Sequence, residues 1–237
     1  MDSPPASGPA PAAGTRRDRY RHGDLHRALL EAGVALAAEG GPDAVVLREA
    51  TRRAGVVPNA AYRHFASRQA LLDAVRAIAL DRLALAMERE MVVAAQMPEP
   101  AARARALLRA VGVAYVGFAQ RHPGLFRTAF SNTVVPGGPP SEQPAAVATE
   151  PVPDDARPPA APDAPRRDPR QLLTSALDAM VEAGVLPATR RPGAEYLAWS
   201  AVHGFSVFLL NGPLRGATPA ERDALGARLL TMVERGL

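Results

Sequence analysis

The stretch LREATRRAGVVPNAAYRHFASRQALL, residues 47–72, decides the fold of this chain. Gly55 can adopt the left-handed conformation that ends a helix, and Pro58 suits the first position of the next one. Ser67 is a good N-cap for a longer helix. We therefore expect helices at 47–54, 58–64 and 68–95. Short helices joined by a tight glycine turn are typical of a helix-turn-helix arrangement.

Helical patterning continues on both sides of this stretch. Asp24 is a suitable N-cap for a preceding helix, which the Gly-Gly-Pro run at 40–42 would end. The segment 192–210 is apolar nearly all round, which predicts a helix buried on all sides. Thr218 and Glu221 form a capping box for the last helix. Further helical segments open at Pro100, Pro123 and Pro169. Because no segment reads as a strand, the sequence predicts an all-α fold.

The composition divides the chain into domains and linkers. Residues 1–19 are rich in Pro, Ala and Gly and should form a disordered arm. Residues 131–168 contain ten prolines and no aromatic residue, so we expect a disordered loop there. This organisation predicts a three-helix domain with the helix-turn-helix at 20–80. A second helical domain at 81–237 would be interrupted by the loop.

The overall composition limits the class of protein. The chain has no cysteine, which excludes disulfides, thiolate metal sites and cysteine nucleophiles. All 28 basic residues are arginine, and with so much Ala, Pro and Gly this indicates GC-rich bacterial codon usage. The N-terminus lacks the apolar core of a signal peptide, and the most apolar run, 196–210, is too short to span a bilayer. We expect a soluble protein of the bacterial cytoplasm.

Positive charge is concentrated in the helix-turn-helix stretch. Residues 47–68 hold five arginines and one acid, Glu49, a local charge of +4 that equals the formal net charge of the whole chain. Such an excess favours a polyanionic partner such as double-stranded DNA. A disordered basic arm formed by the arginines before residue 22 could reach a minor groove, or could be only a charged tail.

The residues after Pro58 have the chemistry that a helix in the major groove needs. Asn59, Ala60 and Ala61 are small enough to allow close approach to the bases. Tyr62 and His64 can donate hydrogen bonds to phosphates from different sides of the helix. Phe65 is expected to anchor this helix to the core instead.

Two segments, YRHGDLHRALLEAG (20–33) and the stretch at 47–72, resemble the DNA-binding domain of TetR-family transcriptional regulators. The resemblance implies that Arg48 contacts DNA from the second helix and that Pro58, Asn59 and Ala60 lie nearest the bases. It implies phosphate contacts for Tyr62 and His64. Arg68 stands where a lysine is common and keeps the charge.

Three positions depart from that family pattern. Val46 and Val57 occupy places where Ser or Thr usually caps the second and third helices. Valine cannot cap, at a cost of about 1 kcal/mol for each helix. Thr51 replaces a small apolar residue, usually alanine. These changes leave the fold prediction intact but remove two possible hydroxyl contacts to phosphate.

The second half resembles the subgroup with a Trp-His-Gly motif, here Trp199, His203 and Gly204. The resemblance implies a small, largely apolar effector bound among the C-terminal helices, and a homodimer formed by the last two helices on a palindromic operator. His203 is expected to be a core histidine bonded to a neighbour, with ligand contact as the alternative. The candidate ligand-binding residues are Tyr115, Phe118, Phe126, Phe130, Trp199 and His203.

Other functions have less support in the sequence. There is no nucleophile elbow, phosphate-cradling glycine loop or metal-ligand cluster, so we predict neither an enzyme nor a cofactor. His22 and His26 with Asp24 would be too few ligands for a metal site. The alternative is an architectural or protein-interaction protein that binds DNA without an effector, which sequence-indifferent binding would indicate. For dimerisation, the expected apolar stripes are Leu225, Leu229, Met232 and Val233, and Phe205, Phe208 and Leu209.

Overall fold

The structure is a computed structural model that describes residues 21–131 and 168–237. Every regular element in these ranges is a helix, which confirms the all-α fold. The expected arm at 1–19 lies outside the described residues, as does the expected loop from 132 to 167. The elements are α1 (Arg21–Gly40), η1 (Pro42–Ala44), α2 (Leu47–Ala54), α3 (Pro58–Ala61), α4 (Arg68–Ala94), α5 (Pro100–Arg121), α6 (Pro123–Ala129), α7 (Pro169–Glu182), η3 (Ala188–Arg190), α8 (Ala194–Asn211) and α9 (Pro219–Gly236).

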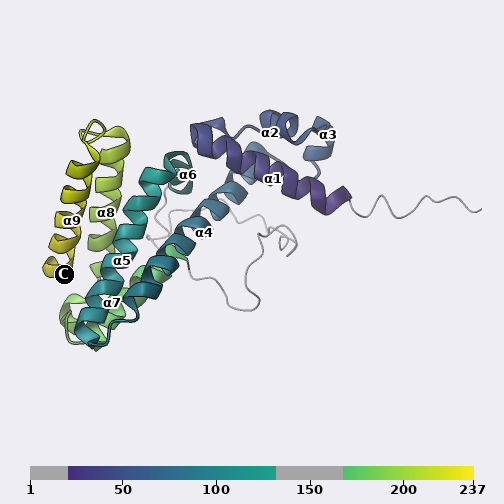
Figure 1. Cartoon of the computed structure of the whole chain (residues 1–237). Coiled ribbons are helices and arrows are strands. Elements are labelled where there is room, and N and C mark those ends of the chain that lie inside the picture. The colour runs from purple at the N-terminus through teal and green to yellow at the C-terminus, as the bar shows by residue number, and fades with distance from the viewer. Residues whose placement is uncertain (1–20, 132–167) are drawn as a thin grey trace, which may run out of the picture.

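The first three helices pack together at one end of the molecule, and the long α4 leads away from them (Figure 1). Leu29 of α1 and Leu71 and Val75 of α4 have no exposed surface in the core between these helices. Phe65 is buried and stacks on His26 of α1, with ring centroids 4.8 Å apart. The prediction that Phe65 anchors the helix-turn-helix to the core is therefore confirmed.

The boundaries of α2 and α4 follow the local signals in the sequence. Gly55 has φ 68°, and its N–H bonds to the carbonyl of Arg52, so α2 ends where glycine allows a left-handed residue. The hydroxyl of Ser67 accepts a hydrogen bond from the N–H of Ala70 at 3.1 Å, which caps α4 as predicted. The cap and the glycine turn thus set the spacing of the helix-turn-helix.

Two boundaries differ from the expectation. The first helix begins at Arg21, so Asp24 lies inside it and is not its N-cap. The third helix ends at Ala61 instead of near His64, because the Ala61 carbonyl accepts the N–H groups of both His64 (3.0 Å) and Phe65 (2.9 Å). This tight turn directs the Phe65 ring into the core.

The second domain is organised around α5. This helix packs against α4, α7, α8 and α9, and α4 also contacts α6 and α7. α4 therefore belongs to both domains, with Leu71 buried near its start and Leu83 and Met87 buried further along. Capping boxes begin α7 (Asp168 with Gln171) and α9 (Thr218 with Glu221), the latter as predicted.

The prediction that 192–210 is buried on all sides is wrong. Val202, Phe205 and Leu209 of α8 are buried, but Leu197 is 65% exposed and Phe208 is 51% exposed. The reason is that α5, α7 and α9 cover only one side of α8 in the single chain. The predicted dimerisation stripes are corrected accordingly. Phe205 and Leu209 point into the core, and Leu225, Leu229 and Val233 of α9 pack partly against it. Phe208 and Met232 point outward.

In the described part of the chain, no helix combines the length and hydropathy needed to cross a membrane.

Candidate nucleic-acid interface and C-terminal cavity

The arginines of the helix-turn-helix differ in whether their charge is already paired. Arg52 binds Glu49 (Nη2–Oε1, 2.6 Å), and Arg53 binds Glu39 of α1 (Nη2–Oε2, 2.6 Å). The hydrogen bond from Arg52 lowers the pKa of Glu49 to about 2, and the hydrogen bond from Arg53 lowers the pKa of Glu39. Both carboxylates are therefore ionised at neutral pH. Glu49 is already counted in the local charge of +4, and Glu39 lowers that charge to +3.

Arg48 and Arg63 remain as available cations. Arg48 is exposed in the first turn of α2, and Arg63 is exposed directly after α3. No carboxylate among residues 25–131 and 168–237 pairs with either guanidinium. Tyr62 lies next to them and is 59% exposed. These three side chains border α3 and have the cationic and hydroxyl chemistry that binds phosphate.

Arg68 has a structural role that the sequence did not indicate. Its Nε donates to the carbonyl of Val45 and its Nη2 to the carbonyl of Pro42, both at 2.8 Å. These bonds tie the start of α4 to the segment between α1 and α2. Arg68 therefore positions the recognition elements, and only its remaining N–H groups are available to DNA.

The remaining predicted DNA-contact residues differ in how exposed their side chains are. Ala60 is half-buried on α3, while the side chains of Pro58 and Asn59 lie outside the described residues. His64 is half-buried, and its ring centroid is 6.1 Å from that of His26. His64 therefore faces α1 more than Tyr62 does.

The structure accounts for the departures from the family pattern. Val46 stands at the N-cap of α2 without a side-chain cap, and Val57 is 70% exposed before α3. Thr51 is 3% exposed, and its hydroxyl donates to the carbonyl of Arg48 at 2.6 Å. The buried hydroxyl is thus satisfied locally, which explains how threonine is tolerated where alanine is usual.

An aromatic cluster lies in the C-terminal domain, contributed by α5, α6 and α8. Its members are Tyr115, Phe126, Phe130, Trp199 and His203, with ring-centroid separations from 5.0 Å to 6.2 Å. Tyr115 Oη and His203 Nδ1 are 2.7 Å apart and share a hydrogen bond. Burial raises the pKa of Tyr115 and lowers that of His203, so both groups are neutral at physiological pH. The expectation of a histidine bonded to a neighbour is confirmed.

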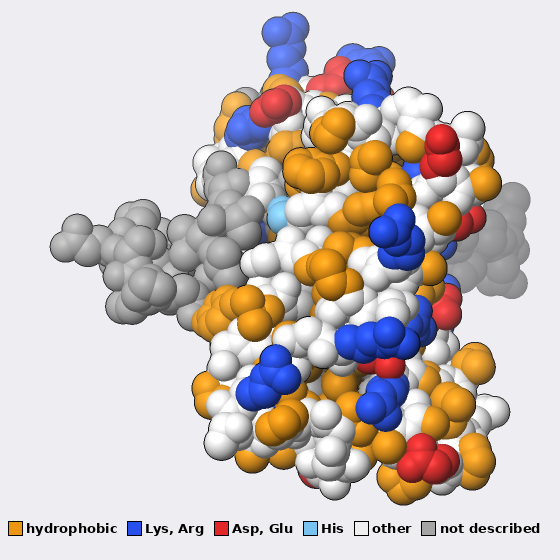
Figure 2. Space-filling view, turned by 90° about the vertical axis from the view of Figure 1, so that its left-hand side faces the viewer, with side chains coloured by type: hydrophobic (Ala, Val, Ile, Leu, Met, Phe, Trp, Pro, Cys, Tyr) orange, Lys and Arg blue, Asp and Glu red, His pale blue; other side chains and the backbone are white. Residues whose placement is uncertain are grey.

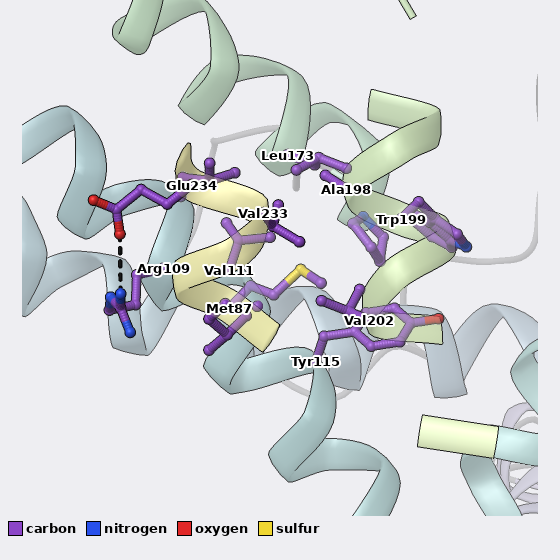
Figure 3. A pocket seen from close by; sticks show the side chains of 14 residues that line it. Met87, Arg109, Val111, Tyr115, Leu173, Ala198, Trp199, Val202, Val233 and Glu234 are labelled. Atoms are coloured by element: carbon purple, nitrogen blue, oxygen red, sulfur yellow. Dashed lines mark hydrogen bonds and ion pairs between the residues drawn. The ribbon is translucent and has the colours of Figure 1, made fainter. Parts of the chain in front are cut away.

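A small cavity adjoins this cluster, between α4, α5, α7, α8 and α9 (Figure 3). Its free volume is about 20 Å³, and its walls are mostly apolar, with Met87, Val111 and Val202 among them. At one end Arg109 Nη2 binds Glu234 Oε2 at 3.0 Å, and Figure 3 shows this pair on the side away from Trp199. The cavity therefore has an aromatic end and a charged end.

Only some of the predicted ligand residues come together. Tyr115 and Trp199 line the cavity, whereas Phe126, Phe130 and His203 lie in the adjacent aromatic cluster. Phe118 belongs to neither, because it packs beside His122 at 5.2 Å in the core.

Sequence reasoning missed Arg109 and Glu234, which lie 125 positions apart in the chain. No local sequence pattern connects two positions so far apart. Their pairing can therefore be seen only in the folded chain.

The junction between the two domains is formed by α6 against α1. Gly124 lies so close to the carbonyl oxygens of Ala37 and Ala38 that a Cβ there would collide with the backbone. Arg127, one turn further along α6, lies over Gly41, which has φ 77°. Since α6 carries Phe126 and is followed directly by Phe130, one short helix touches both the aromatic cluster and the helix-turn-helix domain.

These features define an all-helical protein in which a helix-turn-helix domain is joined to a second domain with its own cavity. Two family sequence models match it: that of the bacterial regulatory proteins of the tetR family at residues 29–75, and that of the tetracyclin repressor-like C-terminal domain at residues 108–233. The second match spans more than half of the chain. The chain belongs to the TetR family of DNA-binding transcriptional regulators.

Solved structures are similar to the chain over most of its length. A protein of unknown function from Rhodococcus sp. RHA1 is 26% identical, with TM-score 0.64, over 93% of this chain and 98% of that one. A TetR-family regulator from Streptomyces coelicolor is 18% identical, with TM-score 0.42, over 93% and 97% of the two chains. A second regulator from that organism is 25% identical, with TM-score 0.40, over 90% and 97%. No curated protein gave a significant match.

Proposed function

We propose that this regulator is a repressor that binds a palindromic operator as a homodimer and is released by a small, largely apolar effector. The observation that carries the DNA-binding part is the set of available donors around α3. Arg48, Tyr62 and Arg63 are exposed beside a short helix that Phe65 holds in the core. Phosphate contacts from these side chains would position α3, with residues 58–60 nearest the base edges.

The proposed dimer rests on apolar surface that the single chain leaves open. Leu197 and Phe208 of α8 and Met232 of α9 are each at least half exposed. Figure 2 shows hydrophobic side chains spread over the face of these two helices, with arginines between them. A second copy related by a two-fold axis would cover this surface as a four-helix bundle. That symmetry would present two copies of α3 to two half-sites about one DNA turn apart.

The proposed release depends on two conformations that the effector distinguishes. α4 runs from the helix-turn-helix to the cavity, where its Met87 forms part of the wall. α6 connects the aromatic cluster with the backbone of α1 through Gly124. An effector that binds better when α4 and α6 have moved would change the separation of the two recognition helices.

Selection of bound sequences from a random DNA library, followed by footprinting, tests the DNA-binding part of this proposal. We expect a palindrome with half-sites about ten base pairs apart between centres. Binding that depends on salt but is indifferent to sequence would contradict a specific regulator and favour an architectural protein instead. Reporter transcription from the selected operator, with and without the regulator, then distinguishes repression from activation.

A further inference from the structure

The cavity of the C-terminal domain combines an apolar body with a positively charged end. Glu234 Oε2 accepts a hydrogen bond from Arg109 Nη2 at 3.0 Å. Its other oxygen, Oε1, lies 3.4 Å from Arg105 Nε. Arg109 and Glu234 line the cavity, and Arg105 lies beside Glu234 outside the lining. Two guanidinium groups thus share one carboxylate, which leaves this group of three side chains with a net positive charge. The Arg105 side chain is 48% exposed, and that of Arg109 is 39% exposed, so both can be reached from outside.

We propose that the effector of this regulator is a small amphipathic anion. Its apolar body occupies the cavity, and its carboxylate binds Arg105 and Arg109 in exchange with Glu234. This inference rests on the proposed function above, since it names the chemical class of the effector that the C-terminal domain binds.

The charged end favours an anion over other amphipathic molecules. Guanidinium groups bind carboxylates through two parallel hydrogen bonds, which is the strongest contact available at this site. An ammonium group would instead face two like charges beside Glu234. A neutral alcohol would gain only the apolar contacts. Arg109 and Tyr115 are six residues apart on α5, or about 9 Å along its axis, which favours an apolar body of medium chain length.

The cavity must widen to admit such a molecule, because about 20 Å³ holds no more than a water. The side chain of Leu230 fills the space above Gly112, where a Cβ would collide with it. Leu230 is the only residue of α9 that is fully buried, while Leu225, Leu229 and Val233 are partly buried against the same core. The contacts of Arg105 and Arg109 with Glu234 and Thr231 add to that attachment. A ligand carboxylate that replaces Glu234 would therefore loosen the helix that closes the cavity.

Trp199 provides a direct measurement, because it lines the cavity and is the single tryptophan of the chain. The full chain is titrated with decanoate, decanol and decylamine, each below the concentration at which it aggregates, while tryptophan fluorescence is recorded. Decanoate should give a saturable change at a concentration about tenfold or more below that needed for decanol. Decylamine should bind weakest.

Two substitutions at the charged end should act in opposite directions. Arg109→Met should remove the preference for decanoate over decanol. Glu234→Gln should increase the affinity for decanoate, because the guanidinium groups no longer have a competing carboxylate. Arg215→Met is the matched control, since Arg215 is exposed outside the cavity and the change in net charge is the same as for Arg109→Met. Thermal melts establish that each variant is folded. If Arg109→Met does not fold, the affinity of Glu234→Gln for decanoate alone tests the proposed carboxylate site.

Equal affinity for decanoate and decanol in the unaltered protein would overturn the proposal. So would the absence of any fluorescence change with decanoate, or a Glu234→Gln variant that binds decanoate no more tightly. Operator binding is measured separately by fluorescence anisotropy. Selective decanoate binding that leaves operator affinity unchanged would support this ligand class and contradict release by the effector. Specific operator binding together with equal affinity for decanoate and decanol would contradict this ligand class and leave the DNA-binding part of the proposed function standing.

Discussion

Among individual residues, Arg48 and Arg52 provide a matched pair for testing DNA contact. Both are exposed on α2, but Arg52 is paired with Glu49 and Arg48 has no carboxylate partner among the described residues. We predict that Arg48→Ala weakens operator binding by about tenfold. It should also reduce the slope of log affinity against log salt concentration by about one. Arg52→Ala should have a much smaller effect. Fluorescence anisotropy at several salt concentrations measures both, and equal losses would contradict the assignment.

Tyr62 and His64 can be tested for phosphate contact by the same assay. Tyr62→Phe and His64→Ala should each weaken binding to all DNA sequences by a similar factor, because phosphate contacts carry no base information. Asn59→Ala should instead change the preferred base at one position of the operator. Circular dichroism should show unchanged helicity in all three variants. Unchanged affinity in both Tyr62→Phe and His64→Ala would disprove the phosphate contacts.

For individual helices, the sequence predicted a helix end correctly where that end depends on residues nearby in the chain. The ends of α2 and the start of α4 depend on Gly55 and on the Ser67 cap, which act within three residues. The end of α3 was predicted too late, because it depends on how Phe65 must turn to reach His26 of α1. The charged end of the cavity was not predicted at all, since Arg109 and Glu234 meet only after folding.

The junction helix α6 gives a prediction about close packing. Gly124→Ala should destabilise the chain by about 1–3 kcal/mol and displace α6 from α1, because its Cβ would collide with the carbonyl oxygens of Ala37 and Ala38. Gly226→Ala in α9 is the matched control, since its Cβ would lie 3.5 Å from Phe205 in ordinary contact. Chemical denaturation measures both. A Gly124→Ala variant as stable as the control would show that the junction is loose.

We predict that the connection between α6 and α7 tolerates shortening without loss of either helix. Residues 132–167 contain ten prolines and no aromatic residue, and loop closure changes only slowly with length. We expect a short Gly/Ser linker there to shift the melting temperature by a few degrees, provided that Ser131 and Asp168 are kept. The Ser131 carbonyl accepts from Arg76 at 2.7 Å, and Asp168 caps α7. Loss of soluble protein would show that the replaced residues pack on the core.

For the whole molecule, the critical prediction is assembly as a homodimer. Phe208→Arg should give monomers or insoluble protein and abolish specific operator binding, although no DNA-facing residue is changed. Val93→Arg is the matched control, because Val93 is also apolar and is 71% exposed but lies at the far end of α4. Light scattering at micromolar concentration measures the mass. A monomeric unaltered protein that still binds a palindrome tightly would refute the proposed dimer.

The contact of Gly124 with the backbone of α1 also bears on how this regulator could be re-engineered. Sensors are often built by fusing the operator-reading domain of one regulator to the effector-binding domain of another. Here the boundary cannot be cut cleanly between the two, because α6 of one domain rests directly on the carbonyl groups of Ala37 and Ala38 of the other. A working chimera would have to exchange the end of α1 together with α6, so that donor and recipient keep a matching pair of surfaces.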